Sequence, residues 1–272
     1  MILISVMDKV LLAVVVRSDS QRLANKWALP IDGIPALGLL IARYRFCRDS
    51  SNPVLWLSFK HELFICTSER DDDDMIAAYA SYLGIDCFRG DADSVALRLT
   101  ALAEERGYDY IMRLTGDNPL VDFDLVGQLI EFNQGLKFDY SRVGGIPVGV
   151  SGEIFSVSLL RRIVLATAES PAASEYLTFF VSQNSSSVVT TELTKQSFAE
   201  IESTYNFGMD NKSDYIFLLK LASFVNPICC DVADLVETVS LLVEDGLQLP
   251  KSSSRSIESL SFDFGLDDFR CS

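Results

Sequence analysis

Histidine is almost absent from this chain, since His61 is the only one among 272 residues. One histidine argues against catalytic triads built on histidine and against His-rich zinc sites. Paired cysteine motifs are missing too, because none of the six cysteines has C-x-x-C spacing and three lie in apolar segments (Cys47, Cys66, Cys87, Cys229, Cys230, Cys271). We therefore expect reduced, mostly structural thiols and a cytoplasmic protein.

Positive charge is scarce as well. The chain has 23 Lys and Arg against 38 Asp and Glu, a net charge of −15, and no Lys/Arg-rich run. Extended nucleic-acid binding rests on neutralising phosphates, so it is not expected. An acidic protein that binds a polyphosphate needs a local basic pocket, a divalent cation, or both.

Long apolar runs are also missing. No uncharged apolar stretch approaches the roughly 18 residues of a membrane span, so no membrane partner is expected. The opening MILISVMDKVLLAVVV is apolar, but Asp8 and Lys9 divide it, no basic region precedes it and no small-residue cleavage site follows. It is interpreted as a leader and a buried strand rather than a signal peptide.

Strand and helix patterns alternate through the first half of the chain. Strand-like runs at 11–16, 62–68, 85–89 and 108–112 are separated by helical patterns at 35–48, 75–84 and 94–106. Such alternation predicts a parallel sheet covered by helices on both faces. With 49% hydrophobic residues, the chain suits a single α/β domain over 1–250, followed by a Ser-rich, then acidic and aromatic tail at 251–272.

The stretch RLTGDNPLVD, residues 113–122, is where the other motifs are expected to meet. It follows a short strand and precedes a helix, so Asp117 should stand beyond the carboxyl end of a strand. In open α/β sheets this crevice binds ligands. The alternative is that Asp117 only caps a turn, since Asp, Asn and Pro are common turn residues.

A basic loop, RSDSQRLANK, follows the first strand. Arg17, Arg22 and Lys26 fall within ten residues there, and three cations at the end of a strand can clamp phosphates. A solvated basic loop is the alternative. The acidic quartet 71–74 is interpreted as helix capping, with a metal cluster as the alternative.

The second half is less regular. Gly and Pro interrupt a strand-like stretch after residue 138, and we expect a small lobe at about 139–200. Its polar residues Arg142, Glu153 and Glu175 either face an acceptor or are surface charges. Asp210 is expected at a later strand-to-helix junction, and Asp231 with Asp234 marks the start of the last amphipathic helix.

Read together, RSDSQRLANK, CTSERDDDDMIAAYASYLGIDCFRGD and DYIMRLTGDNPLVDFDLV resemble the cytidylyltransferase family of the spore-coat polysaccharide and acidic-sugar type, which includes the CMP-sialic-acid and CMP-Kdo synthetases. The resemblance covers about residues 10–225 and is strongest over 64–130. It implies a three-layer α/β/α sandwich with a mostly parallel sheet, like that of nucleotide-diphospho-sugar transferases, and transfer of CMP from CTP to a sugar-acid-like acceptor with release of pyrophosphate. A homodimer is implied as well.

The resemblance also implies roles for individual residues. Arg17, Arg22 and Lys26 fall on the cations that hold the CTP phosphates, and Ser20 matches in the same loop. Asp117 and Asp210 fall on the carboxylates that hold Mg²⁺, both at the ends of strands of one sheet. Other candidates for contacts to the nucleotide stand near strand ends in the matching region (Thr67, Ser68, Arg89, Arg98).

The chain departs from the family pattern at several positions. Asp19 replaces a loop glycine, Ala24-Asn25 replaces Pro-Gly, and Tyr176 replaces the histidine of E-H-x-T. Two alternatives therefore remain beside the cytidylyltransferase: another nucleotidyltransferase or a glycosyltransferase on the same fold, and a degenerate nucleotide-binding module.

Overall fold

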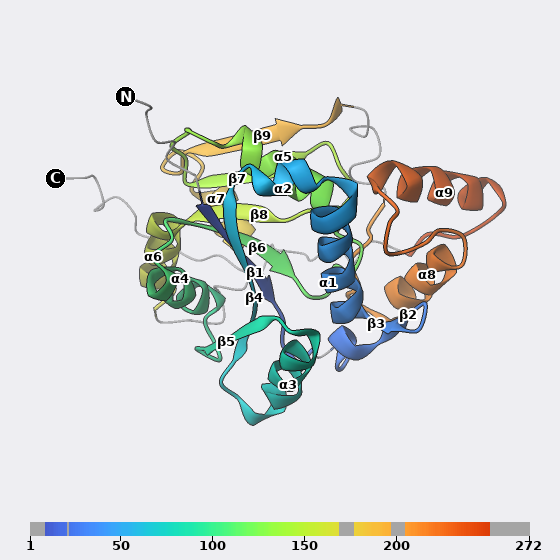
Figure 1. Ribbon diagram of the computed structural model, residues 1–272, viewed down its shortest axis with the longest axis horizontal. Coiled ribbons are helices and arrows are strands. Elements are labelled where there is room, and N and C mark those ends of the chain that lie inside the picture. Colours follow the sequence, from blue (N-terminus) through green and yellow to red (C-terminus); the bar gives the residue numbers. More distant parts are fainter. Residues whose placement is uncertain (1–8, 21, 169–176, 197–204, 251–272) are drawn as a thin grey trace.

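The computed structural model describes residues 9–20, 22–168, 177–196 and 205–250. A seven-stranded sheet runs through the molecule in the order β5-β4-β1-β6-β8-β7-β9 (Figure 1). Its strands are β1 (Lys9–Val15), β4 (Lys60–Ser68), β5 (Asp86–Gly90), β6 (Tyr110–Thr115), β7 (Tyr140–Gly144), β8 (Glu153–Ser156) and β9 (Thr190–Thr194). A small antiparallel pair, β2 (Pro30–Ile31) with β3 (Ile34–Pro35), lies outside this sheet.

The strands on the β5 side of the sheet are all parallel, as the sequence predicts. β1 pairs in parallel with both β4 and β6, and β4 with β5. β8 runs antiparallel to β6 and β7, while β9 is parallel to β7. The stretch 139–200 thus contributes three strands to the same sheet.

Helices cover both faces of the sheet. On one face pack α4 (Val95–Arg106), α6 (Val157–Ala166) and α7 (Leu177–Gln183). The other face carries α1 (Ala36–Phe46), α2 (Pro53–Leu57), α5 (Phe123–Phe132), α8 (Lys212–Ala222) and α9 (Val232–Glu244). The helix α3 (Asp74–Leu83) lies near the β5 edge, and three short turns complete the chain: η1 (Lys26–Ala28), η2 (Cys47–Ser51) and η3 (Asp71–Asp73).

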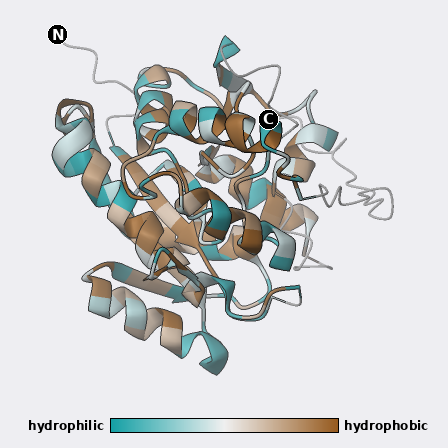
Figure 2. Cartoon of the chain, turned by 90° about the vertical axis from the view of Figure 1, so that its right-hand side faces the viewer, coloured by the Kyte–Doolittle hydropathy of each residue, from teal (hydrophilic) through white to brown (hydrophobic). Residues whose placement is uncertain are grey.

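β1 is an inner strand, between β4 and β6, and its side chains divide between two apolar cores. Leu11 and Ala13 belong to the core under α4 and α6, whereas Leu12 and Val14 belong to the larger core under α1 and α5. Successive side chains of a strand point to opposite faces, so a continuous apolar run fits a strand covered on both sides. Figure 2 shows the apolar residues inside and the polar ones outward. The predicted three-layer α/β/α sandwich is confirmed.

A buried arginine links α1 to the segment between the C-terminal helices α8 and α9. Arg43 of α1 is 4% exposed. Its guanidinium donates to the carbonyl oxygens of Val121 (2.8 Å), Pro227 (2.6 Å) and Cys230 (2.8 Å). Asp231 and Asp234 form the capping box predicted at the start of α9. None of the helices in the described ranges is long and apolar enough to cross a membrane.

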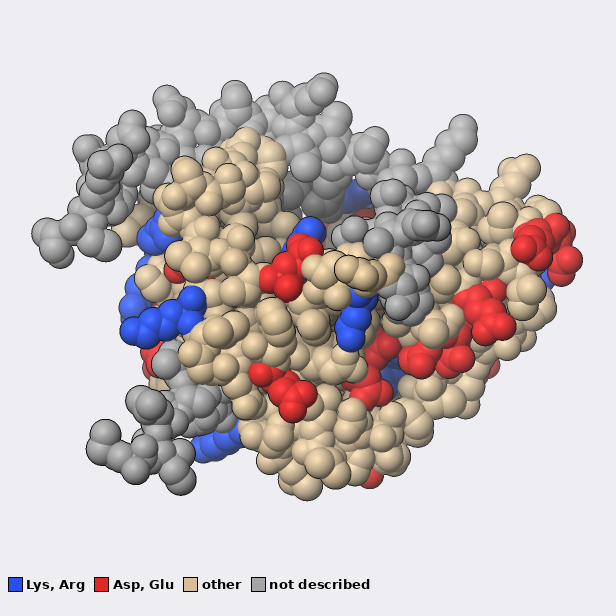
Figure 3. All heavy atoms as spheres, turned by 90° about the horizontal axis from the view of Figure 1, so that it is seen from above, with Lys and Arg blue, Asp and Glu red and all other residues tan. Residues whose placement is uncertain are grey.

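Charge is unevenly spread over the face that Figure 3 shows. Acidic side chains gather on its right, where Figure 1 places α9, and Lys and Arg side chains gather toward its left.

Candidate active site

The carboxyl ends of three parallel strands meet at one edge of the sheet. Val15 of β1 pairs with Cys66 of β4 on one side and with Thr115 of β6 on the other. The loops that follow these strands therefore start side by side. The basic loop of residues 17–26 therefore lies next to the turn that carries Asp117, although the two are far apart in the sequence.

The turn that carries Asp117 packs closely against the end of β1. The amide of Gly116 donates to the Val15 carbonyl (2.8 Å), and a Cβ on Gly116 would stand 2.8 Å from the Cβ of Val16. Only glycine permits so close an approach. The Asn118 amide donates to the Thr115 carbonyl (3.0 Å) and closes the turn, so the backbone of Asp117 is fixed at the edge of the sheet.

Asp210 lies at the same site but comes from a later segment of the chain. The prediction that it ends a strand of the central sheet is wrong for the described residues of its segment, 205–210, which make only an isolated bridge, between Val148 and Asn206. The segment is nevertheless tied to the site, because the Met209 amide donates to the carbonyl of Asp117 (2.8 Å). The Asp214 carboxylate accepts from the Asp210 amide (2.9 Å) as α8 begins.

Four charged side chains converge between these loops. The ammonium of Lys26 donates a hydrogen bond to the Asp117 carboxylate and stands 3.8 Å from Oδ1 of Asp210. Nη2 of Arg22 also stands 3.8 Å from that Asp210 oxygen. The side chains of Lys26, Asp117 and Asp210 are 17%, 25% and 30% exposed, so the cluster is accessible from solvent yet partly shielded.

The two carboxylates fit a magnesium ion. Asp117 and Asp210 both approach one ammonium, so a single cation can interact with both. Mg²⁺ prefers oxygen ligands and usually keeps several waters beside one or two carboxylates and substrate phosphates. Among the described residues, no group of three or more His, Cys, Asp or Glu is placed to hold a metal. A metal at this pair therefore needs water or substrate oxygens to complete its coordination.

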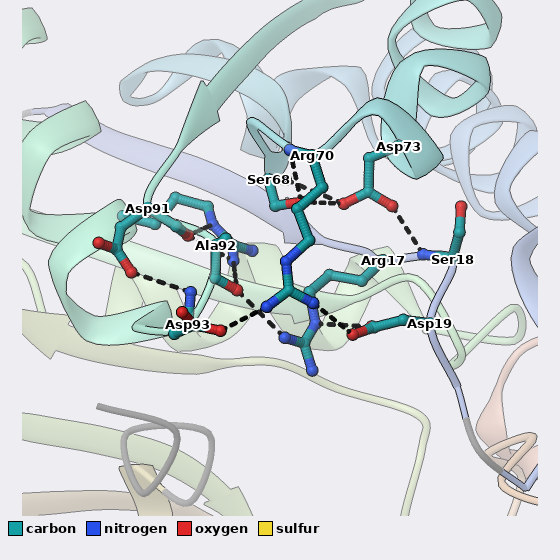
Figure 4. A network of polar contacts seen from close by, with 10 residues as sticks. Arg17, Ser18, Asp19, Ser68, Arg70, Asp73, Asp91, Ala92 and Asp93 are labelled. Atoms are coloured by element: carbon teal, nitrogen blue, oxygen red, sulfur yellow. Dashed lines mark hydrogen bonds and ion pairs between the residues drawn. The ribbon is translucent and has the colours of Figure 1, made fainter. Parts of the chain in front are cut away.

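Arg17 stands in a second cluster, on the β4 side of the edge (Figure 4). Its Nε lies 3.3 Å from Oδ1 of Asp19, and its Nη1 donates to the Ala92 carbonyl (3.2 Å). Arg70, from the loop after β4, binds the other Asp19 oxygen (3.1 Å) and Oδ1 of Asp93 (2.5 Å). Arg70 was not among the site residues predicted from the sequence. The only feature of the sequence that could have indicated Arg70 is its position, two residues after the end of a predicted inner strand.

The acidic quartet lies in the first turns of η3 and α3, as predicted, but Asp73 does not cap α3. The side chain of Asp73 makes no capping hydrogen bond to α3, and the buried carboxylate instead accepts from the Ser18 amide (2.8 Å) and from the amide and hydroxyl of Ser68. Burial raises the pKa of Asp73, but these hydrogen bonds outweigh it and hold the pKa below its usual value. Asp73 therefore ties the start of the basic loop to the end of β4.

The other residues that were predicted to contact the nucleotide are buried or bind protein groups. Thr67 and Ser68 are fully buried at the end of β4. Arg89 donates to the Ser68 carbonyl (3.0 Å) and pairs with Asp74 (2.5 Å). Each of these residues stands beside the site but faces protein groups.

Two further candidates hold loops in place. Arg98 is fully buried and donates to the Asp91 carbonyl from Nε (3.0 Å) and Nη2 (2.8 Å), and burial lowers the pKa of its guanidinium. The hydroxyl of Ser20 accepts from the Leu23 amide (3.4 Å) within the basic loop. Arg98 thus fixes the loop after β5, and Ser20 shapes the loop that carries the cations.

Arg142 and Glu153, two of the acceptor candidates, are direct partners in the antiparallel pairing of β7 with β8, but each binds other residues. Glu153 sits at the β6–β8 pairing, where one carboxylate oxygen binds Arg113 (2.5 Å) and the other accepts from Tyr140 and from Thr178 (2.7 Å). Burial raises the pKa of Glu153, but Arg113 and these hydrogen bonds outweigh it and lower the pKa. The half-exposed Arg142 pairs with Glu192 (2.8 Å). Glu175 and Tyr176 lie outside the described residues.

A mostly parallel sheet flanked by helices is the fold of nucleotidyltransferases among solved structures. A cytidylyltransferase from Leptospira borgpetersenii serovar Hardjo-bovis (strain JB197) superposes with a TM-score of 0.71 at 24% identity, covering 90% of this chain and 99% of that one. CMP:2-keto-3-deoxy-manno-octonic acid synthetase complexed with CTP superposes with a TM-score of 0.54 at 13% identity, covering 79% and 99%.

The chain belongs to the cytidylyltransferase family, whose model matches residues 12–237. Among curated proteins, the spore coat polysaccharide biosynthesis protein SpsF of Bacillus subtilis (strain 168) is 28% identical over 211 residues, which are 77% of this chain and 84% of SpsF. The protein MJ1063 of Methanocaldococcus jannaschii is 24% identical over 221 residues, 81% of this chain and 86% of that protein.

Proposed function

We propose that this protein transfers CMP from CTP to a sugar-acid or related acceptor, with Mg²⁺ as cofactor, for surface polysaccharide or glycan biosynthesis. The observation that carries the proposal is the convergence of Arg22, Lys26, Asp117 and Asp210 at the carboxyl edge of the sheet. Family membership supports nucleotidyl transfer from CTP. The likeness to SpsF supports a polysaccharide pathway.

In this reaction an acceptor oxygen attacks the α-phosphorus of CTP, the bond between the α- and β-phosphates breaks, and pyrophosphate leaves with the bonding electrons. The work of the protein in phosphoryl transfer is positioning and neutralising charge. Arg17, Arg22 and Lys26 would bind the phosphates and stabilise the leaving pyrophosphate. Asp117 and Asp210 would hold Mg²⁺, which supplies positive charge to the phosphate oxygens when bound.

The acceptor proton cannot go to a histidine. His61, the only one in the chain, pairs with Val10 near the amino end of β4 and binds the Tyr44 hydroxyl (2.9 Å). It therefore lies at the amino ends of the strands, whereas Asp117 lies beyond their carboxyl ends. A hydroxyl acceptor would have to lose its proton to a carboxylate or to water, whereas an ionised acid oxygen has no proton to lose.

We propose that the acceptor binds at residues 139–200, with Arg142, Glu153 and Glu175 as candidates, and that the same region carries a homodimer contact. For Glu153, the contacts with Arg113, Tyr140 and Thr178 favour a role in positioning α7 against the sheet. Arg142 is the more accessible of the two described candidates.

A product assay tests the proposal. Purified protein is incubated with CTP, Mg²⁺ and a panel of sugar acids, and both pyrophosphate and CMP-sugar are measured. Pyrophosphate formed in step with a CMP-sugar supports the cytidylyltransferase. Free nucleoside diphosphate would indicate a glycosyltransferase on the same fold, and no turnover despite CTP binding would favour a degenerate module.

A further inference from the structure

We propose that Arg70 forms, with Arg17, a second cationic arm of the polyphosphate site, and that Asp19 is the resting counter-ion which the phosphates replace. This inference rests on the proposed function and adds a residue to its site. The first arm is Arg22 with Lys26, and their resting counter-ions are Asp210 and Asp117.

The geometry of Asp19 motivates the proposal (Figure 4). Its two carboxylate oxygens are divided between two guanidiniums, Arg17 at 3.3 Å and Arg70 at 3.1 Å. Two guanidiniums around one carboxylate form an anion site, and carboxylate and phosphate oxygens are recognised by the same fork of N–H donors. The occupant of this anion site belongs to the loop that also carries Arg22 and Lys26.

Three loops contribute to this cluster, and two of them are held firmly. Asp73 fixes the Ser18 amide at the end of β1 (2.8 Å), and the buried Arg98 holds the Asp91 carbonyl in the loop after β5 (2.8 Å). These contacts anchor the backbone beside Arg17 and beside Asp93, while the backbone carbonyl of Arg70 accepts a hydrogen bond from Arg89 (2.8 Å). Asp19 is 37% exposed at its side chain and Arg70 is 43% exposed, so exchanging partners there exposes no buried charge.

The cations and carboxylates around the site are equal in number, so incoming phosphates can replace carboxylates as partners of the cations. Arg17, Arg22, Lys26 and Arg70 face Asp19, Asp93, Asp117 and Asp210, so each cation has a carboxylate within 4 Å. A nucleoside triphosphate brings several negative charges, which compete with these carboxylates for the same cations. Asp19 and Asp93 then lower the affinity for polyphosphate, and Arg70 raises it.

Equilibrium binding by calorimetry tests the proposal on the full chain with Mg²⁺ and four variants: Arg70→Gln, Asp19→Asn, Arg70→Gln with Asp19→Asn, and Arg48→Gln as control. Arg48 makes a comparable surface pair with Asp49, and its side chain is 39% exposed. The probes are CTP, CMP and inorganic tripolyphosphate. Arg70→Gln should weaken CTP and tripolyphosphate about fivefold, the size of an exposed ion pair, and leave CMP unchanged.

Asp19→Asn should bind CTP and tripolyphosphate more tightly than the wild type, and this gain should shrink once Arg70 is already Gln. Arg48→Gln should match the wild type with every probe. The inference is overturned if Arg70→Gln binds tripolyphosphate as the wild type does, or if it loses CMP as strongly as CTP.

The proposed function fails in a different way. A wild type that binds tripolyphosphate without preferring CTP to ATP, GTP or UTP would contradict cytidylyl transfer, while the effect of Arg70→Gln on tripolyphosphate would still decide the role of Arg70. The two results are read from separate titrations.

Discussion

Lys26 donates a hydrogen bond to Asp117, 91 positions further along the chain. The contact joins the loop after β1 to the turn after β6, and these strands are direct neighbours in the sheet. Because Asp210 stands 3.8 Å from the same ammonium, Lys26 separates two carboxylates that would otherwise repel each other. The site thus holds its anions and cations in contact before any ligand arrives.

Asp117→Asn and Asp210→Asn should each abolish turnover and leave the fold intact. Both side chains are partly exposed, at 25% and 30%, and exposed ion pairs contribute about 0–1 kcal/mol to stability. The loss should therefore appear in metal-dependent activity, measured as pyrophosphate release over a Mg²⁺ titration, and not in the melting temperature. Asp49→Asn, in a surface pair with Arg48, is the control. Full activity in Asp117→Asn would contradict the metal assignment.

CTP with Mg²⁺ should raise the melting temperature more than ATP, GTP or UTP does. A ligand that binds only the native state stabilises it by mass action, by about 2.7 kcal/mol at one hundred times its Kd. Differential scanning fluorimetry with the four nucleotides measures the shifts, and the same series with EDTA shows how much of each depends on the metal. Equal shifts with all four nucleotides would remove the selectivity for cytosine.

Site residues that directly follow a strand could be predicted from the sequence. Arg17 follows β1 and Asp117 follows β6, so strand ends alone predict that their loops meet. Asp210 could be placed only by resemblance, because its segment bridges Val148 instead of ending a strand of the central sheet.

Partners that come from distant loops could not be predicted. Asp73 looked like a helix cap, yet it accepts from Ser18 across 55 positions, and no local pattern shows such a contact. The same holds for Arg70, which is 51 positions from Asp19. Glu153 was expected either to face an acceptor or to be a surface charge. Instead Tyr140 and Thr178 donate to it, and the pairing of β7 with β8 that brings Tyr140 close to Glu153 is not visible in the sequence.

Arg43→Met should destabilise the protein by about 3 kcal/mol or more, because each buried acceptor left without its donor costs about 1–3 kcal/mol. The substitution leaves the carbonyl oxygens of Val121, Pro227 and Cys230 without their donor. Urea unfolding measures the loss. Arg45→Met is the matched control on the same helix, because Arg45 is only partly buried and donates to a single carbonyl, that of Leu83. Equal losses in both variants would show that Arg43 does not link α1 to the C-terminal helices.

Asp73→Asn should destabilise the protein at neutral pH, by about 1–3 kcal/mol, because three hydrogen bonds to a carboxylate are weakened. The pKa of Asp73 is held below its ordinary value of 3.8 by its hydrogen bonds from Ser68 and Ser18. A lowered native pKa means that the unfolded chain takes up the proton first as the pH falls. The stability that the carboxylate contributes is therefore fully present above about pH 5 and is lost as the pH falls through the native pKa.

The variant without this carboxylate lacks that dependence, so the difference in unfolding free energy between wild type and Asp73→Asn should be constant from pH 7 to about pH 5 and should shrink below pH 4. Urea titrations at several pH values measure it. Asp72→Asn, at an exposed neighbouring position, should follow the wild type throughout. A difference that stays unchanged into acid would mean that Asp73 holds Ser18 and Ser68 equally well when protonated, and the link between the basic loop and β4 would then rest on shape rather than charge.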